Sequence, residues 1–263
     1  MNPSSETTLV ASDATIAVLD GLGASELGLQ EARRWVQAIQ TVARQMRALS
    51  ADTVARARLV SGSDSVPEPL LRVLGDTIVL VWWLPTNPTY ALLQASMDVQ
   101  QIVIGCLQHK IPLRGAVSYG ELAWDAETAL GRAVAEARDW YEAANWLGVM
   151  ATPTCAEELQ RLAQVSGMES VSQFFIPYRV PLKCEATRPD KTWALSWPIE
   201  LAVEALKAHT APSKLLEELL GGMPRDPSHE PIYAAGAAFF EHYMAQWATH
   251  STRIGEAAGR SRA

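Results

Sequence analysis

Thr15–Ser25 has the sequence TIAVLDGLGAS, the stretch from which the fold can be worked out. The β-branched and aliphatic run Thr15–Leu19 predicts a buried strand, which is closed by Asp20 and the turn-like segment GLGAS. Ser25 is the predicted N-cap of the next element. From Glu26 to Leu49 apolar residues recur at intervals of three to four positions, as one face of a long helix requires. A strand, a glycine loop and a helix are therefore predicted in that order.

A hairpin is predicted next along the chain. The apolar runs Leu70–Leu74 and Thr77–Leu84 are separated only by Gly75 and Asp76, residue types that tolerate the positive φ of a primed turn. Asp76 is therefore expected at the hairpin tip. The predicted elements after the hairpin are a helix over Asn87–Lys110, a strand over Pro112–Tyr119, a helix over Ala129–Trp146, a strand over Gly148–Thr152, a helix over Ala156–Gln164, strands around Phe174–Leu182 and Trp193–Trp197, and helices over Ile199–Ala208 and Pro231–Thr249.

Neither a repeat nor a shift in composition marks a domain boundary. We expect a single domain over residues 15–250, with a flexible N-terminus at 1–14 and a flexible tail at 251–263. With 263 residues, of which 48% are hydrophobic, the chain can bury a substantial core. The cysteines Cys106, Cys155 and Cys184 are too few and too widely spaced for a disulfide framework, so we interpret them as buried, reduced thiols.

Charge and hydropathy exclude several classes of protein. Lys and Arg total 22 against 29 Asp and Glu, and this net charge of −7 argues against a nonspecific nucleic-acid binder, although a small anionic ligand is compatible with it. The longest apolar runs are far shorter than the roughly 20 residues of a membrane-spanning helix. The N-terminus MNPSSETTLVASD contains no secretory signal. We therefore expect a cytoplasmic protein that does not cross a membrane.

Asp20 and Asp76 are the candidate metal ligands. Taken singly, each has the ordinary interpretation of a turn residue, because Asp is common in turns. If their strands are neighbours in one sheet, two carboxylates within about 4 Å would repel each other unless a divalent cation lay between them. Mg²⁺ and Mn²⁺ prefer such oxygen ligands together with phosphates.

The order of four segments resembles the catalytic domain of class III nucleotidyl cyclases. These segments are DGLGAS, RVLGDTIVL, LRGAVSYGE and ALGRAVAEA, and the resemblance covers about Thr15–Thr152. It implies an α/β fold, a ferredoxin-like α+β sandwich with a mixed, mainly antiparallel sheet, elaborated C-terminally over 153–250. It also implies a head-to-tail homodimer, in which Asp20 and Asp76 bind two divalent ions, Mn²⁺ or Mg²⁺, per active site. One ion would lower the pKa of the ribose 3′-hydroxyl and the other would clamp the triphosphate.

The resemblance also assigns residues to the triphosphate. Arg114 matches the strand Arg that contacts phosphate in the family, and Lys183 in VPLK resembles a late Lys that reaches the terminal phosphate. Without the resemblance, a solvated or paired surface Arg and a plain strand-to-helix turn are the ordinary interpretations. The backbone N–H groups of the loop could hold the anion at the start of a helix. The loop residues are Gly21, Leu22, Gly23, Ala24 and Ser25.

Two positions bear on the choice of base. Arg72 stands where adenylate cyclases have Lys and guanylate cyclases have Glu, and Thr128 stands where they have Asp and Cys. Arg presents only donors, which suit the O2 and O4 acceptors of uracil, and Thr can donate or accept. UTP is therefore favoured, with CTP as an alternative. The ordinary interpretation of Arg72 is an exposed residue at the start of a strand.

One helix departs from the family pattern. The family has an Asn and an Arg where this chain has Ala135 and Asp139. Arg132 or Arg138 could replace the catalytic Arg, since both lie within a helical turn of its position, but no residue clearly replaces the Asn. This departure leaves open a catalytically inactive relative that binds a nucleotide as a sensor.

The segments RGAVSYGE and EARDWYEAANW look most like the stand-alone pyrimidine cyclases of bacterial anti-phage signalling. That resemblance implies conversion of UTP or CTP into a 3′,5′-cyclic nucleotide and pyrophosphate, as a second messenger for a downstream effector. A purine cyclase is a further alternative. Trp140, Tyr141 and Trp146 are interpreted as core or dimer packing. The histidines show no ligand spacing and no Ser lies in a GxSxG context, so zinc and serine hydrolases are excluded.

Overall fold

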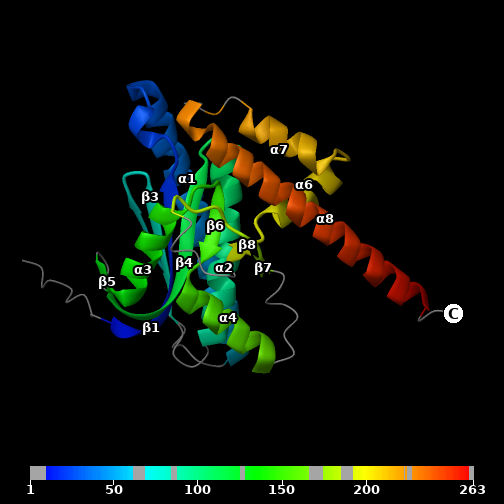
Figure 1. Ribbon diagram of the computed structural model, residues 1–263. Coiled ribbons are helices and arrows are strands. Elements are labelled where there is room, and N and C mark those ends of the chain that lie inside the picture. The colour runs from blue at the N-terminus through cyan, green and yellow to red at the C-terminus, as the bar shows by residue number, and fades with distance from the viewer. Residues whose placement is uncertain are drawn as a thin grey trace, which may run out of the picture.

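A sheet of eight strands with helices on both faces forms the body of the protein (Figure 1). The computed structural model describes residues 10–61, 69–83, 88–124, 128–165, 174–184, 192–221, 223 and 227–260. Its first elements are β1 (Val10–Gly21), the 3₁₀ helix η1 (Ala24–Glu26), α1 (Leu29–Ser61), β2 (Leu70–Leu74), β3 (Thr77–Trp82), α2 (Pro88–Gln108) and β4 (Leu113–Trp124).

The first half of the chain has the predicted ferredoxin-like arrangement. Its strands follow the order β2-β3-β1-β4 across the sheet, and each neighbouring pair is antiparallel. With α1 after β1 and α2 after β3, this is a βαββαβ unit. The central strand β1 is paired on both sides, so the residues at its end lie between two other strands.

The C-terminal half extends the same sheet. β6 pairs with β4 in parallel, and β8 and β7 follow in antiparallel pairs, so the sheet is mixed and mainly antiparallel, as predicted. The additional elements are β5 (Ala129–Gly131), α3 (Arg132–Ala143), β6 (Gly148–Ala151), α4 (Pro153–Val165), β7 (Phe175–Pro177), β8 (Trp193–Leu195), α6 (Pro198–Lys207), α7 (Pro212–Leu220), the 3₁₀ helix η3 (Pro227–His229) and α8 (Glu230–Arg260).

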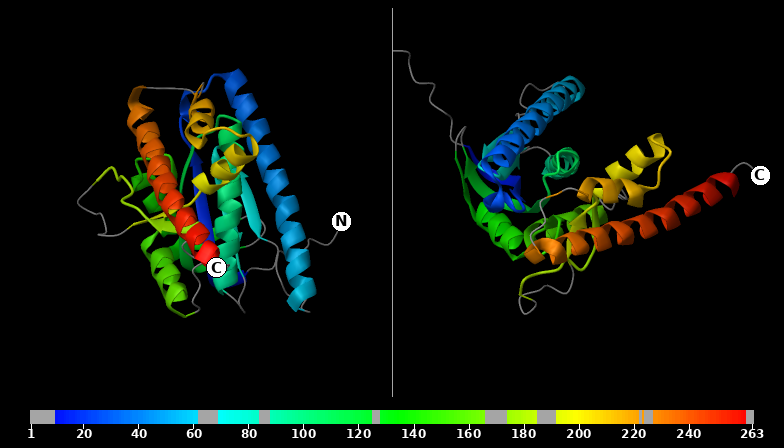
Figure 2. Two further views of the ribbon diagram at one scale, coloured as in Figure 1. Left: turned by 90° about the vertical axis from the view of Figure 1, so that its right-hand side faces the viewer. Right: turned by 90° about the horizontal axis from the view of Figure 1, so that it is seen from above.

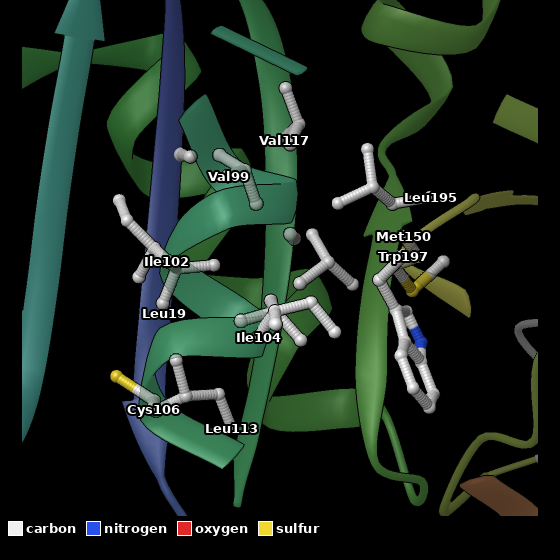
Figure 3. Packing of buried hydrophobic residues seen from close by; sticks show 14 of the residues in the cluster. Leu19, Val99, Ile102, Ile104, Cys106, Leu113, Val117, Met150, Leu195 and Trp197 are labelled. Carbon is white, nitrogen blue, oxygen red and sulfur yellow. The ribbon is translucent and has the colours of Figure 1, made fainter. Parts of the chain in front are cut away.

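Alternation along β1 divides its side chains between two apolar layers. Ala17 and Leu19 belong to the larger layer, which α1 and α2 cover as they run side by side across one face (Figure 2). Ile16 and Val18 belong to a smaller layer under α3 on the other face. Because the larger layer includes residues from β1 through α8, the C-terminal half shares the core of the first half. Figure 3 shows part of this layer, with Trp197 beside Met150 and Leu195 and the residues that α2 contributes on the other side of the view.

The start of α1 differs from the prediction. Gly23, in the left-handed region at φ 85°, is the N-cap of η1, and Ser25 lies inside that 3₁₀ turn, so Ser25 does not cap α1. At the start of α1 the N–H of Gly28 donates to the Glu31 carboxylate at 3.2 Å, as in half of a capping box. The helix then continues to Ser61, beyond the predicted end.

The hairpin has the predicted bounds at its turn, between β2 and β3. Gly75 has φ 66°, whereas Asp76 is not among the described residues with positive φ, so only the glycine needed that freedom. Residues 84 and 87, which were predicted to end a strand and begin a helix, lie outside the described residues.

Several later elements also differ from the predictions. Ala129–Gly131 forms β5 against β4 instead of the first turn of a helix, and α7 was not predicted. β1 begins at Val10, earlier than predicted. α8 continues to Arg260, and its last turns extend beyond the body of the protein (Figure 2). The ends expected to be flexible therefore contribute to β1 and α8, while 1–9 and 261–263 lie outside the described residues.

No helix in the described part of the chain has the length and apolarity needed to span a bilayer. Cys106 and Cys155 are buried, as expected, and burial raises the pKa of the Cys106 thiol to about 12. Cys184 is exposed, so the prediction that it is buried was wrong. It lies two residues after Leu182, which forms an isolated bridge with Ala144.

Candidate active site

The two predicted acidic residues meet at the ends of adjacent strands. Asp20 of β1 is the register partner of Thr77 of β3, and Asp76 immediately precedes Thr77. The N–H of Gly21 donates to the carbonyl of Asp76 at 3.2 Å. A Cβ on Gly21 would lie 3.0 Å from the ring of Trp35 and 3.3 Å from the Cβ of Asp76, so glycine is what allows the two strand ends to approach. The strands that carry the two aspartates are thus neighbours.

Arg114 of β4 lies on the other side of Asp20. The two residues are register partners, and Nε and Nη2 of Arg114 donate to Oδ2 of Asp20 at 3.2 and 3.0 Å. Their side chains are only 18% and 17% exposed. Arg114 is therefore a half-buried residue paired with Asp20, which fits the paired form of the ordinary interpretation and not the solvated one.

The acidic pair is incompletely compensated. Burial is the main cause that raises the pKa of Asp20, and the charge of Asp76 raises it further, whereas Arg114 and Thr77 lower it without restoring the ordinary value. A divalent cation would supply the missing positive charge. Two carboxylates suit Mg²⁺ or Mn²⁺, which commonly takes one or two protein carboxylates and completes its shell with water and phosphate. Nowhere in the described residues do three or more His, Cys, Asp or Glu cluster as a metal site.

Lys183 also lies close enough to Arg114 for their charges to interact. The N–H of Lys183 donates to the carbonyl of Ala143 at the end of α3, at 2.8 Å. Burial and then the charge of Arg114 lower the pKa of the Lys183 ammonium, against the opposing effects of Glu142 and Asp20. The site therefore gathers Asp20, Arg114 and Lys183 from segments far apart in sequence.

Tyr141 was interpreted as a packing residue, and its place at the site was missed. The guanidinium carbon of Arg114 lies 5.7 Å from the centroid of the Tyr141 ring. A sequence signal existed, because Ala133, Ala137 and Tyr141 are spaced four apart, and the two alanines are the buried residues of α3. These three residues lie on the side of α3 that faces the sheet, and Tyr141 is the one of them next to Arg114, at the start of β4.

The glycine loop is only partly available to an anion. The N–H of Gly21 is bonded to Asp76, and the N–H of Leu22 donates to the carbonyl of Pro112 at 2.9 Å. The side chain of Leu22 is also buried. The candidate N–H donors are therefore those of Gly23, Ala24 and Ser25. A cavity of about 370 Å³ lies beside Ala24, Ser25 and Asp76, and the ring of Trp35 forms part of its wall.

His229 of the C-terminal half lies against this loop. Its Nδ1 would be 3.7 Å from a Cβ placed on Gly23, and its Nε2 is 3.8 Å from the Glu26 carboxylate. Within the described residues, Nδ1 is buried without a hydrogen-bond partner. The sequence carried no signal for this contact, because His229 follows the loop by most of the chain length and has no ligand spacing.

Arg132 and Arg138 are not at the acidic pair within one chain. Arg132 follows Gly131, which pairs with Leu122, and eight strand residues, about 26 Å, separate Leu122 from Arg114 on β4. Arg132 lines a separate cavity of about 640 Å³ together with Asp13 and Glu121. Arg138 is exposed and its Nη2 pairs with Asp139 at 2.9 Å.

The two predicted base-facing residues lie at different places in the sheet. Arg72 is on β2, opposite Val79, and is half-buried rather than exposed. Since Val79 pairs with Val18, Arg72 lies two register positions from the level of Asp20, on the second strand across from β1. Thr128 is exposed and comes immediately before β5, near Arg132 at the other end of β4. Within one chain, Thr128 and Arg132 are therefore separated from the acidic pair, whereas Arg72 lies at the same end of the sheet.

Comparisons with known proteins give similarities only among solved structures. No family model and no curated protein matches the chain. The catalytic core of a rhodopsin-guanylyl cyclase with converted specificity, in complex with ATPαS, is 9% identical over 73% of this chain and 98% of that chain, with a TM-score of 0.49. The guanylate cyclase domain of RhGC from Catenaria anguillulae, in complex with GTP, is 9% identical over 70% and 97%, with a TM-score of 0.47. The adenylyl cyclase CyaB from P. aeruginosa is 11% identical over 72% and 95%, with a TM-score of 0.43.

Proposed function

We propose that this chain is a nucleotidyl cyclase that converts UTP, with CTP as the alternative substrate, into the 3′,5′-cyclic nucleotide and pyrophosphate. The observation that supports this most directly is that Asp20, near the end of β1, and Asp76, directly before β3, lie on adjacent strands, with Arg114 hydrogen-bonded to Asp20. The same residues occur in the segments that resemble class III cyclases. A turn-forming role alone does not account for a half-buried ion pair at the junction of three strands.

The proposed roles follow from the chemistry of each side chain. Asp20 and Asp76 would hold Mn²⁺ or Mg²⁺, which when bound lowers the pKa of the 3′-hydroxyl and neutralises the triphosphate. Arg114 offers planar N–H donors that fit phosphate as well as carboxylate, so it can exchange the Asp20 carboxylate for a phosphate oxygen. Lys183 adds a second positive charge near Arg114. The N–H groups of Gly23, Ala24 and Ser25 provide further donors.

The base and ribose would be contacted by Arg72, Thr128 and Arg132. In a head-to-tail dimer, Arg72 and Thr128 of one chain would face the acidic pair of the other. Arg72 would donate to the uracil carbonyls, which accept and do not donate. Arg132, on the rim of its own cavity, is the better candidate than Arg138 for the transition-state Arg, because Arg138 is already paired with Asp139.

A catalytically inactive nucleotide-binding sensor is the second candidate function. Ala135 and Asp139 stand where the family has its Asn and Arg, and neither can perform the same chemistry. The ion pair between Arg114 and Asp20 would suit a protein that exchanges the carboxylate for a ligand phosphate without turnover. A purine cyclase is a third candidate, since only Arg72 and Thr128 favour a pyrimidine.

Incubation with each ribonucleoside triphosphate and Mn²⁺, followed by chromatography of the products, separates these functions. We expect cyclic UMP, whereas cyclic CMP or a cyclic purine nucleotide as the main product would change the substrate assignment. Nucleotide binding by calorimetry without product would favour the sensor, and absence of both binding and product would refute the proposal. The anti-phage role and the effector remain predictions, to be tested by following product formation in infected cells.

A further inference from the structure

The ring of Tyr141 lies at the candidate site, but Tyr141 has none of the proposed roles in binding the metal, the phosphates or the base. Its predecessors on the same line of α3, Ala133 and Ala137, are 2% and 0% exposed and pack on the sheet. Tyr141 itself is half-buried and packs against both apolar layers. Its ring is therefore held in place from two sides by the core.

The contacts of Arg114 use two different parts of its guanidinium. Two N–H groups at the edge, those of Nε and Nη2, donate to Asp20, while the carbon of the group lies 5.7 Å from the centroid of the Tyr141 ring. The attraction between the guanidinium charge and the ring depends on the position of the charge over the ring, not on which anion accepts from Nε and Nη2. Arg114 can therefore change its edge partner while the ring remains in contact.

We propose that Tyr141 is a positioning residue whose ring holds the Arg114 guanidinium in the site, independently of which anion binds at the guanidinium edge. The consequence for nucleotide binding rests on the proposed function. When a cation binds the Asp20 carboxylate, Arg114 loses its hydrogen-bond acceptor. The Tyr141 ring then keeps the N–H groups of Arg114 directed to the position where a phosphate oxygen can replace the carboxylate. The contact is with the ring face, so the phenol hydroxyl is dispensable.

Four variants test this role. Tyr141→Phe keeps the ring and removes the hydroxyl, whereas Tyr141→Leu removes the ring. Tyr141→Met is a second ringless variant, for use if the Leu variant does not fold. Trp140→Leu is the matched control, because Trp140 is the neighbouring half-buried aromatic residue of α3 and packs in the larger layer.

The first readout needs no nucleotide and no activity. In ¹⁵N NMR spectra of arginine Nε–H groups, the Arg114 signal is identified by its loss in Arg114→Lys. We expect a ring-current shift and slow solvent exchange in the wild type, in Tyr141→Phe and in Trp140→Leu. Loss of that shift is expected in the ringless variants, and fast exchange is expected in them once Mg²⁺ competes for the Asp20 carboxylate, which protects Nε–H until then. An Arg114 signal that is the same in Tyr141→Leu as in the wild type would overturn the proposal.

The second readout is binding of 3′-deoxy-UTP with Mn²⁺ by calorimetry, since this nucleotide cannot cyclise. We expect the Kd to rise about tenfold, or about 1.4 kcal/mol, in the ringless variants and to stay within about twofold in Tyr141→Phe. With UTP as substrate, KM should rise by a similar factor while kcat changes little. A ringless variant that binds as tightly as the wild type would overturn the positioning role, whereas a wild type that binds no triphosphate but shows the NMR changes would refute only the proposed function.

Discussion

Asp20 interacts with both charged neighbours of the site, and their effects on its carboxylate are opposite. It takes the hydrogen bonds of Arg114, lies in the field of Asp76 and is half-buried at the end of the central strand. Sequence patterns identified Asp20 and Asp76 as a repelling pair, but the ion pair with Arg114 makes the two aspartates unequal. Removing the charge of Asp76 relieves repulsion, whereas removing that of Asp20 leaves Arg114 unpaired.

Asp20→Asn and Asp76→Asn should each lower turnover by orders of magnitude, because each removes a carboxylate from the metal site. In EDTA, Asp76→Asn should be at least as stable as the wild type, and Asp20→Asn should be less stable. Steady-state kinetics with Mn²⁺ and urea unfolding check the two effects. The double variant should be little less active than the worse single one. Turnover within a few-fold of wild type in either single variant would contradict the metal assignment.

Asp98 provides a second test at the residue scale, away from the site. Its carboxylate accepts hydrogen bonds from Trp82 Nε1 at 2.7 Å, Gln94 at 3.2 Å and Ser50 at 3.3 Å, joining β3, α2 and α1. Burial outweighs these bonds and raises the pKa of Asp98 to about 6. The folded state therefore binds a proton more tightly than the unfolded chain, whose Asp pKa is about 4. This preference stabilises the fold below about pH 4 and is lost as the pH rises through 6.

Asp98→Asn should remove this pH dependence. A shift of about 2 pKa units corresponds to about 3 kcal/mol, so the free energy of unfolding of the Asn variant, relative to the wild type, should rise by up to that amount between pH 4 and pH 8. Urea unfolding of both proteins across this range measures the difference. A difference that does not change with pH would show that the Asp98 carboxyl has an ordinary pKa in the fold.

At the scale of elements, α8 is joined to the rest of the fold through a close backbone approach. The N–H of Leu147 donates to the carbonyl of Ile232 at 3.2 Å. A Cβ on Gly236 would lie 2.7 Å from the Cβ of Leu147 and 3.0 Å from its carbonyl oxygen. The helix can lie this close to the start of β6 only because Gly236 has no side chain. The helix α8 is thereby tied to the connection between α3 and β6.

Gly236→Ala should therefore destabilise the protein, although Ala is the better helix former. Overpacking costs about 1–3 kcal/mol, and the gain in helix propensity recovers at most about 1 kcal/mol, so a net loss of about 1 kcal/mol is expected. Urea unfolding checks this against Ala234→Gly, at an exposed position of the same helix, which measures the difference in helix propensity without a packing change. A Gly236→Ala protein as stable as the wild type would mean that α8 moves away from Leu147 without cost.

At the scale of the whole molecule, Arg132 and Thr128 lie at the opposite end of β4 from the acidic pair. Arg114 and Leu122 mark these two ends, near the acidic pair and near Arg132 respectively. The proposed head-to-tail dimer would bring Arg132 and Thr128 of one chain to the acidic pair of its partner, forming two sites. Light scattering under assay conditions tests the dimer, and a strict monomer would remove the shared site.

Mixing two inactive variants tests the shared site directly. Asp20→Asn and Arg132→Ala damage different halves of the proposed site, so a mixed dimer would contain one site with both native halves. With free exchange of subunits, the mixture should recover about a quarter of wild-type activity. Asp20→Asn mixed with Asp76→Asn is the control and should recover none, because both lie in the same half. Equal activity in the two mixtures would place the whole site within one chain.

Local patterns were enough to predict much of the fold. Alternating and helical apolar spacing predicted β1, the hairpin and α2, because a side chain's face follows from its position along a strand or helix. Glycine and aspartate turn signals predicted where the strands end, and hence that Asp20 and Asp76 could meet. Short elements such as β5 were missed, because Ala129–Gly131 is too short to show a period and pairs only because β4 lies beside it.

The sequence by itself determined the order of the elements, the acidic residues at the strand ends and the need for glycine at the turn. Only the tertiary structure decided that Arg114 pairs with Asp20, that the Tyr141 ring lies at Arg114, that His229 lies against Gly23 and that Arg132 lies at the far end of β4. The physical reason is that local conformation depends on neighbours a few residues away. The charge and contacts of a site depend on which strands and helices pack together. The spacing of residues along the chain does not predict the distances between side chains of different elements.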